Sequence, residues 1–291
     1  MQENNITQII IDTINTILGN LFSSIDNNLY SVLDNITFVN SSILKDKNFE
    51  NIFGTSSTNG ILLIANSLVL GFLLYFSIKL LFSHITYSKV EEPHSFLIKL
   101  ILCAIFMNCS YFIMSFFLDF IFNISSSIKL IGESLFSKEI SFSELINTIN
   151  TNISIDTTTI DVFSIDGLIK SILSISLLNL IFSYSFRYIL IKVFILISPF
   201  AILSNCLNNT SWFFKSWLKN LFSLLFIQII VSIILLILFS INYNSSNIVT
   251  KFIYVGGIFA LIKANTFVRD LVGGLSTNIS QNFSNFQKFN I

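Results

Sequence analysis

Charged side chains are scarce in this sequence. They make up 11% of the 291 residues, whereas a soluble domain has about 25%. Hydrophobic residues make up 53%, and the mean hydropathy is +0.77. The apolar residues are collected in continuous runs instead of being spaced along one face of soluble helices. We therefore expect a membrane protein and not a soluble globular domain.

Proline and cysteine are also rare, with two and three residues respectively. Cys103, Cys109 and Cys206 lie in or beside apolar runs, where a thiol acts as a small apolar side chain. Their spacing gives neither a disulfide framework nor a zinc site. We expect no metal and no cofactor. The first five residues lack Lys and Arg, so the start of the chain is not typical of a secretory signal.

Sequence motifs of enzymes are missing as well. The chain has no Walker A loop, no Ser/His/Asp arrangement and no HExxH motif, so no enzyme is expected. His84 and His94, with Glu91 and Glu92, match no metal-ligand spacing and are expected in a loop. No basic cluster is large enough to hold nucleic acid. Energy for any transport would come from a partner or an ion gradient.

The composition is rich in Ile, Phe, Asn and Ser, which is typical of an AT-rich bacterial genome. The predicted location is the bacterial cytoplasmic (inner) membrane, as a multi-pass protein. The predicted fold class is all-α with about five transmembrane helices. The expected spans are Gly60–Phe82, Phe96–Phe122, Leu168–Phe186 with or without Val193–Leu203, Leu221–Phe239 and Phe252–Val268.

An amphipathic helix or helix pair is predicted at Ile6–Ile36, because its apolar residues recur at steps of three or four. Two interpretations stay open for it: a helix at the membrane surface or on a partner, and a helix packed on the protein's own spans. The predicted division of the chain has five parts. These are the N-terminal helical region 1–59, a first transmembrane hairpin 60–122, an acidic extracytoplasmic loop 123–167, a transmembrane core 168–268 and a cytoplasmic tail 269–291.

The orientation is predicted from the lysines and arginines. They cluster at the turn after the first span, at the turn after the third and at the end of the fifth. Since cytoplasmic loops carry an excess of Lys and Arg, the N-terminus is expected outside and the C-terminus inside. Lys170 and Lys251 lie at outer span ends and disagree with this orientation, but they are outnumbered.

The central stretch, residues 168–239, contains the candidate site residues. Arg187 follows a long apolar run, and Lys192 and Pro199 come soon after it. In one continuous helix Arg187 would lie deep in the membrane and would need a partner. The favoured interpretation is that the helix leaves the hydrocarbon near Arg187 and that Pro199 breaks or kinks the next apolar run.

Trp212 and Trp217, with Lys215 and Lys219, are predicted to form an aromatic and cationic anchor at the membrane interface. They stand in the polar break before the fourth apolar run. Gly256 and Gly257 interrupt the fifth run and are the one hint of a broken helix.

The segment from Arg187 through Pro199 to Trp212 and Trp217, followed by a long apolar run, resembles the TrbL-type polytopic membrane subunits of type IV secretion (conjugal transfer) systems. The resemblance covers the last third to half of the chain, and the first half resembles the family by topology alone. It implies a channel or scaffold subunit that forms homo-oligomers in the membrane. The implied partners are lipid, other channel subunits, their ATPases and a transferred DNA–protein substrate.

Two other classes stay open at this point. One is the permease subunit of a small-molecule transporter, which predicts inverted repeats and broken helices at the membrane midplane. The other is a small pore-forming or immunity membrane protein. Neighbouring genes would separate the three classes, because a conjugation-type ATPase and a relaxase would favour the first.

Overall fold

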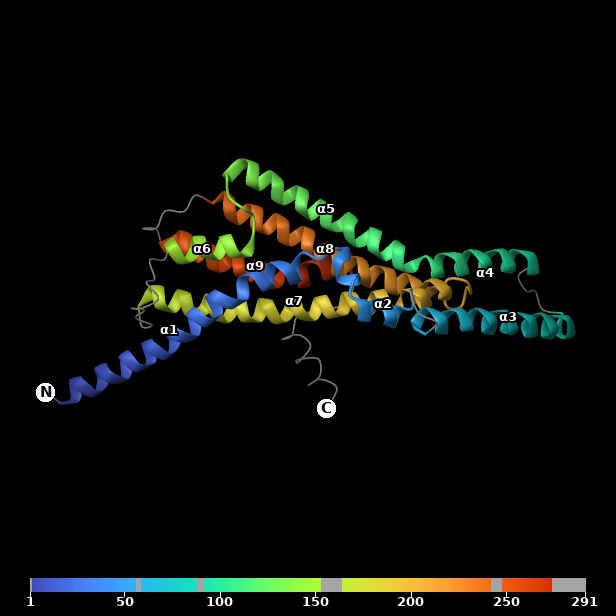
Figure 1. The fold of residues 1–291 in the computed structure, drawn as a ribbon, viewed down its shortest axis with the longest axis horizontal. Helices are drawn as coiled ribbons and strands as arrows, with labels where there is room; N and C mark the ends of the chain where they lie inside the picture. Colours follow the sequence, from blue (N-terminus) through green and yellow to red (C-terminus); the bar gives the residue numbers. More distant parts are fainter. Residues whose placement is uncertain (1, 56–58, 88–91, 153–163, 242–247, 274–291) are drawn as a thin grey trace.

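The computed structural model of the chain describes residues 2–55, 59–87, 92–152, 164–241 and 248–273. The regular elements in these ranges are helices, and their order along the chain is shown in Figure 1. They are α1 (Gln2–Thr37), η1 (Ser41–Leu44), α2 (Lys47–Phe53), α3 (Ile61–Thr86), α4 (Pro93–Asn108), α5 (Ser110–Phe136), α6 (Phe142–Asn152), α7 (Ile165–Ser204), α8 (Ser211–Ser240) and α9 (Ile248–Val272).

Five of these helices, α3, α5, α7, α8 and α9, are long and apolar enough to cross a membrane. The predicted all-α, multi-pass fold is therefore confirmed. The helices follow the long axis of the molecule in alternating directions (Figure 1). α1 and α3 together run along it once, α4 and α5 run back, and α7, α8 and α9 complete three further passes.

Helix α8 is the centre of the bundle and packs against α5, α7 and α9. Apart from Ser223, Gln228 and Ser232, its sequence from Leu221 to Leu238 is apolar. A helix that is hydrophobic all round is buried in a protein core or spans a membrane. Two groups of buried side chains enclose α8. One joins α8 to α6, α7 and α9, and the other joins it to α2, α5 and α7.

The predicted second span, Phe96–Phe122, is wrong in its boundaries because the helix breaks at Cys109. At the break, Asn108 Nδ2 donates a hydrogen bond to the carbonyl oxygen of Ala104 at 2.8 Å, and Asn side chains that bond nearby backbone compete with helix continuation. Asn108 also exchanges two amide hydrogen bonds with Asn66 of α3, both at 3.1 Å. Beyond the break, α5 continues to Phe136, so the loop predicted from Asn123 begins inside a helix.

The amphipathic helix predicted near the N-terminus is present as one helix, α1. Its C-terminal part packs on α6 and α7, and Leu33 is fully buried there. Its N-terminal part projects away from the bundle in Figure 1. Ile9, Ile10 and Ile17 on this projecting part are more than half exposed.

The polar segment that follows α1 contains the short helices η1 and α2. Asn40 caps η1 by accepting from Ser42 N–H at 2.9 Å, and Asp46 caps α2 by accepting from Asn48 N–H at 3.0 Å. Gly54 ends α2 in a left-handed conformation, with φ of 96°, which only glycine adopts without strain. The caps, and not apolar periodicity, specify these short helices.

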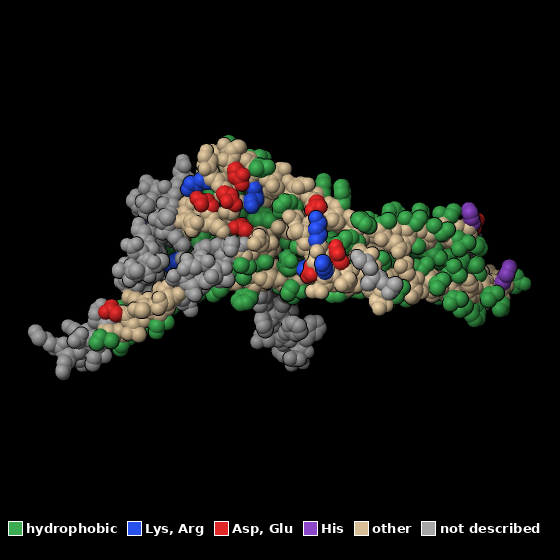
Figure 2. Space-filling model, viewed as in Figure 1, with side chains coloured by type: hydrophobic (Ala, Val, Ile, Leu, Met, Phe, Trp, Pro, Cys, Tyr) green, Lys and Arg blue, Asp and Glu red, His purple; other side chains and the backbone are tan. Residues whose placement is uncertain are grey.

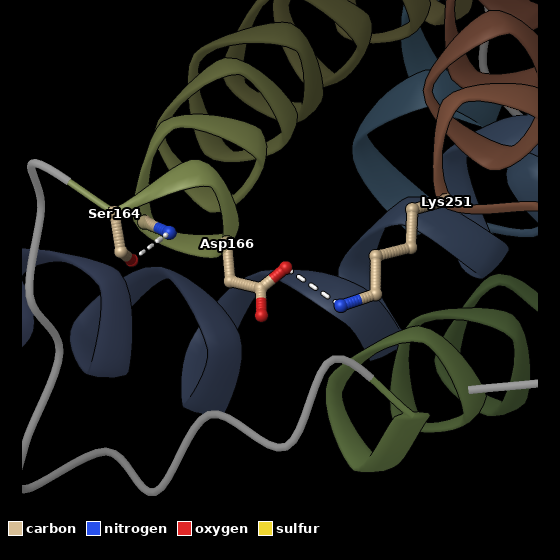
Figure 3. Close-up of polar contacts among 4 residues, drawn as sticks. Ser164, Asp166 and Lys251 are labelled. Carbon is tan, nitrogen blue, oxygen red and sulfur yellow. Dashed lines mark hydrogen bonds and ion pairs between the residues drawn. The ribbon is translucent and has the colours of Figure 1, made fainter. Parts of the chain in front are cut away.

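Figure 3 shows the polar contacts where α7 begins, next to the start of α9. Ser164 caps α7 by accepting a hydrogen bond from the Gly167 amide at 3.0 Å. Two residues further on, Asp166 pairs with Lys251 of α9, with 2.6 Å between Oδ1 and Nζ. The carboxylate also stands in the first turn of α7, where the positive end of the helix dipole favours it.

Candidate functional site

Arg187 lies near the middle of α7 and is completely buried. The predicted break near Pro199 is not present, because α7 is one helix of 40 residues with Pro199 inside it. Where this helix leaves the membrane stays a prediction. The surrounding helices, and not water, cover the guanidinium. In a helix bundle, neighbouring helices can accommodate the backbone group that a proline leaves unpaired.

The Arg187 guanidinium makes three hydrogen bonds to oxygen atoms of neutral groups. Nε donates to the carbonyl of Leu224 at 2.8 Å, and Nη1 donates to the carbonyl of Thr37 at 2.9 Å. Nη2 donates to Gln228 Oε1 at 3.4 Å. The acceptors belong to α1 and α8, so one side chain on α7 connects three helices.

Thr37 is the last residue of α1, and the carbonyls at a helix C-terminus lack partners within the helix. They also carry the negative end of the helix dipole, which favours a cation. Gln228 completes the contact, because its Oε1 also accepts from the Val39 amide at 3.0 Å. We call this group, Arg187 and Gln228 with the backbone of Thr37 and Val39, the arginine latch.

Two further polar contacts join α7 to α9. The hydroxyl of Tyr184 donates to the carbonyl of Leu261 at 3.0 Å, and Asn265 Nδ2 donates to Ser183 Oγ at 2.6 Å. All four groups are buried. Sequence reasoning missed Ser183 and Asn265, since Asn and Ser are so frequent in this chain that neither stood out.

The two tryptophans do not form the predicted single anchor. Trp217 is only 4% exposed, while Trp212 is 67% exposed. The indole of Trp217 donates to the carbonyl of Phe194 at 2.8 Å. This bond joins α8 to α7 about one turn before Pro199. Trp212 alone keeps the exposure that an interfacial anchor requires.

The remaining predicted site residues are spread over the bundle. Lys192 is half-buried and lies over the rings of Phe49 and Tyr188, at 5.6 and 5.2 Å from their centroids. Lys215 and Lys219 are exposed on α8. The structure therefore brings Arg187 together with residues of α1 and α8, and it leaves these lysines outside the arginine latch.

The two glycines of α9 differ from one another. A Cβ at Gly256 would meet no atom within 4 Å, whereas a Cβ at Gly257 would overlap the methyl groups of Leu238. Gly257 thus permits the close approach of α8 and α9. The helix runs through both glycines without interruption, so the predicted hint of a broken helix is not present in the structure.

In the ranges that the structure describes, no three His, Cys, Asp or Glu side chains gather as metal ligands would. His84 lies in the last turn of α3 and His94 at the start of α4, both exposed, so the loop predicted for them is wrong. No protein-family model matches the sequence, and no curated protein matches it either. The fold and its apolar surface define a multi-pass helical membrane protein.

Proposed function

We propose that this protein is a non-enzymatic channel or scaffold subunit of a type IV secretion machine in the bacterial cytoplasmic membrane. One observation carries the proposal. The segment that resembles the TrbL-type subunits contains side chains that hydrogen-bond one helix to another. Arg187 connects α7 to α1 and α8, and Trp217 connects α8 to α7. Their contacts hold helices together and present no reacting group.

The packing within one protomer favours a scaffold that acts with other copies. Buried Leu, Ile, Phe and Tyr side chains fill the space between α7, α8 and α9. A second apolar cluster fills the space between α5, α7 and α8. A DNA strand or an unfolded protein needs a polar, open path, so it would pass between copies of this chain or between this chain and its partner subunits. The proposal therefore includes a homo-oligomer that works with the ATPases of the machine.

The permease alternative predicts a helix broken at the membrane midplane. Gly256 and Gly257 were the residues that suggested such a break, and α9 is continuous there. The close fit of Gly257 against Leu238 gives that glycine a packing role. This leaves the scaffold proposal as the one that the geometry supports best.

A transfer assay in the source cell tests the proposal. Deletion of the gene is expected to abolish transfer of the mobile element, and a plasmid copy of the full chain is expected to restore it. Cross-linking followed by purification of a tagged, functional copy should recover a conjugation-type ATPase. Unchanged transfer after deletion, or recovery of a nucleotide-binding transporter subunit in place of that ATPase, would overturn the proposal.

A further inference from the structure

An open groove lies between α7 and α9 on the surface of the bundle. Its volume is about 350 Å³, which falls within the range of small-ligand sites, about 300–1,000 Å³. Its apolar walls are Ile172 and Ile175 of α7 and Phe259 and Ile262 of α9. The first three of these side chains are exposed, so the groove faces the surroundings of the protein and not its interior.

The polar side chains that line the groove can all donate hydrogen bonds. Lys263 of α9 is exposed, Asn179 of α7 is half-buried and Ser176 of α7 is buried. An ammonium group donates only, while an amide and a hydroxyl donate as well as accept. Among the residues that the structure describes, no acid lines the groove and no carboxylate pairs with Lys263. These groups together suit an anion.

The two helices of the groove run in the same direction. Asp166 pairs with Lys251 near the start of both helices (Figure 3), and Asn265 bonds Ser183 further along. The residues joined by these contacts are 85 and 82 positions apart. A residue of α7 is therefore about level with the residue of α9 that follows it by this interval.

By this register, the cation and the amide lie at one end of the groove. Asn179 is about level with Lys263, whereas Ile172 lies about two turns earlier on α7. A molecule in the groove would have its apolar part beside Ile172 and Ile175, and its anionic part beside Asn179 and Lys263.

Lys263 lies within the apolar length of α9. It is twelve residues after Lys251 and six before Arg269, about 18 and 9 Å along the helix axis. A cation inside the hydrocarbon is costly without a partner, and a lysine near the end of a span reaches head-group depth by extending its aliphatic stem. This depth suits a phosphate group at the inner edge of the head-group layer.

An anionic phospholipid has the two properties that the groove requires. Its acyl chain is apolar, and its phosphate accepts hydrogen bonds and carries negative charge. Basic pockets between transmembrane helices bind such head groups. One lipid molecule would thus satisfy both the apolar walls and the polar end.

We propose that the groove binds one acyl chain of an anionic phospholipid, with Lys263 and Asn179 beside the lipid phosphate. The inference rests on the membrane location in the proposed function and on no other part of it. The bound lipid would contact both α7 and α9, and it would give Lys263 the anionic partner that Lys251 has in Asp166.

A tryptophan introduced in the groove can report the bound lipid. Phe259 lines the groove and is 45% exposed, so Phe259→Trp places the reporter there. The experiment uses the full chain with Trp212→Phe and Phe259→Trp in phosphatidylcholine nanodiscs. The protein with Trp212→Phe alone gives the background from the buried Trp217.

The nanodiscs contain an increasing mole fraction of phosphatidylglycerol with brominated acyl chains, and quenching of tryptophan fluorescence is measured. Brominated phosphatidylcholine is measured in the same way. One lysine near the membrane surface contributes about 1 kcal/mol to the attraction of an anionic lipid, and about 1.4 kcal/mol is tenfold in affinity. We therefore expect half-maximal quenching at a mole fraction about fivefold lower for phosphatidylglycerol.

Three further variants of this protein locate the source of the preference. Lys263→Gln should reduce the preference to about one. Asn179→Asp has nearly the same shape but places a carboxylate beside the phosphate position, and it should also abolish the preference. Lys215→Gln removes an exposed lysine of α8 that does not line the groove, and it should leave the preference unchanged.

Two results would overturn the proposal. One is equal quenching by the two lipids in the protein with Trp212→Phe and Phe259→Trp. The other is a preference that persists in Lys263→Gln, or that Lys215→Gln lowers as much, because the preference would then come from the charge of the whole surface and not from the groove.

This outcome is separate from the transfer assay. A lipid preference without any effect of gene deletion on transfer would refute the secretion proposal and leave the lipid site standing. The opposite pair of results would refute the lipid site alone.

Discussion

Arg187 is buried among the helices of the bundle, a position that is costly for a charge without partners. Its three hydrogen bonds supply those partners from backbone and amide oxygens. In return, the guanidinium gives the last carbonyl of α1 a donor that the helix itself cannot provide. The residue thereby stabilises the position of α1, which supplies one of its three acceptors.

Replacement of Arg187 by Leu tests this role. We expect the free energy of unfolding to fall by about 3 kcal/mol, because buried acceptors lose hydrogen bonds to a charged donor. Cys206 is buried, whereas Cys109 is exposed and Cys103 is half-buried. In a background with Cys103→Ser and Cys109→Ser, reaction of the Cys206 thiol with a fluorogenic maleimide during heating in detergent therefore reports unfolding. The midpoint temperature should fall, and transfer activity should be impaired if the secretion proposal is right.

Two variants serve as controls for Arg187→Leu. Arg187→Lys keeps the charge but loses the planar set of guanidinium donors. We expect its free energy of unfolding to lie between those of the parent protein and Arg187→Leu. Lys192→Leu removes a cation five residues further on, whose ring contacts contribute about 0.5–1 kcal/mol. An Arg187→Leu protein as stable as the Lys192→Leu protein would refute the arginine latch.

The two adjacent glycines of α9 give a second prediction at this scale. Gly257→Ala should lower the free energy of unfolding by about 1–3 kcal/mol, because the added methyl group overlaps Leu238. Gly256→Ala meets no atom and should stabilise the helix by about 0.5–1 kcal/mol. Thermal unfolding of the two single variants measures the difference.

A double variant checks the cause. In a Leu238→Ala background, Gly257→Ala should lower the free energy of unfolding clearly less than it does in the parent protein, since the two side chains no longer compete for one space. The same loss in both backgrounds would show that Leu238 is not what constrains Gly257.

Helix length depends on more than apolar composition in this chain. α7 continues through Arg187 and Pro199, whereas the apolar stretch from Phe96 to Phe122 is divided at Cys109. At the division, Asn108 forms an amide pair with Asn66 of α3. Pro199 is buried inside α7, among neighbouring helices.

Among the five described helices that could cross a membrane, α3 is the least buried. Only 11% of the apolar window of α3 is buried, and Figure 2 shows hydrophobic side chains over the end that the α3–α4 hairpin forms. Its contact with the rest of the bundle includes Cys103 of α4 and Cys206 of the α7–α8 turn, whose thiols are hydrogen-bonded. These two thiols can report whether the hairpin keeps this position in a membrane.

We predict that a copper–phenanthroline oxidant joins Cys103 to Cys206 in the Cys109→Ser variant. The two thiols lose their hydrogens and electrons to the oxidant and form one intramolecular disulfide. Loss of both maleimide-reactive thiols under denaturing, non-reducing conditions measures the bond. Cys103→Ser, which leaves Cys109 and Cys206, is the control and should form no intramolecular bond. Two thiols that stay free in the membrane-bound Cys109→Ser protein would contradict the packing of the hairpin.

At the scale of the whole molecule, the helices are longer than one bilayer core. α7 has 40 residues and a length of about 60 Å, against a hydrocarbon thickness of about 30 Å. The α3–α4 hairpin extends still further along the same axis (Figure 1). A belt of acidic and basic side chains crosses the middle of the face in Figure 2. One bilayer core therefore cannot cover all of the apolar surface. The rest is covered by other protein subunits, or the α3–α4 hairpin moves to a position beside the bundle.

The structure shows the surroundings of Lys170 and Lys251, the two lysines that disagree with the predicted orientation. Lys251 is paired with Asp166, and Lys170 is 4% exposed, so neither is a free surface charge of the kind that the orientation rule counts. At the opposite end of the α7–α9 bundle, Lys215 and Lys219 remain exposed. The outside N-terminus and inside C-terminus stay a prediction.

Cysteine labelling tests that orientation. In a background where Cys103, Cys109 and Cys206 are replaced by Ser, a cysteine at Thr158 should react with a membrane-impermeant maleimide added to intact cells. A cysteine at Ser88 should react only after the membrane is opened. The reverse pattern would invert the topology of the whole chain.

The sequence alone determined the class and the number of long helices. Membrane partition depends on the summed hydrophobicity and charge of a local run, and these can be read without knowing what the run packs against. The five apolar segments and the amphipathic α1 follow from that sum. The boundaries at Cys109 and at α2 did not follow, because side-chain caps and amide pairs decided them.

Only the tertiary structure decided what the candidate residues do. Arg187 meets Thr37 and Gln228, which are 150 and 41 positions away, so no local pattern could show that its charge has partners. Trp217 is buried and Trp212 exposed, and Gly257 is confined where Gly256 is free. In each pair the two residues are alike in sequence. They differ because packing covers one face of a helix and leaves the other open.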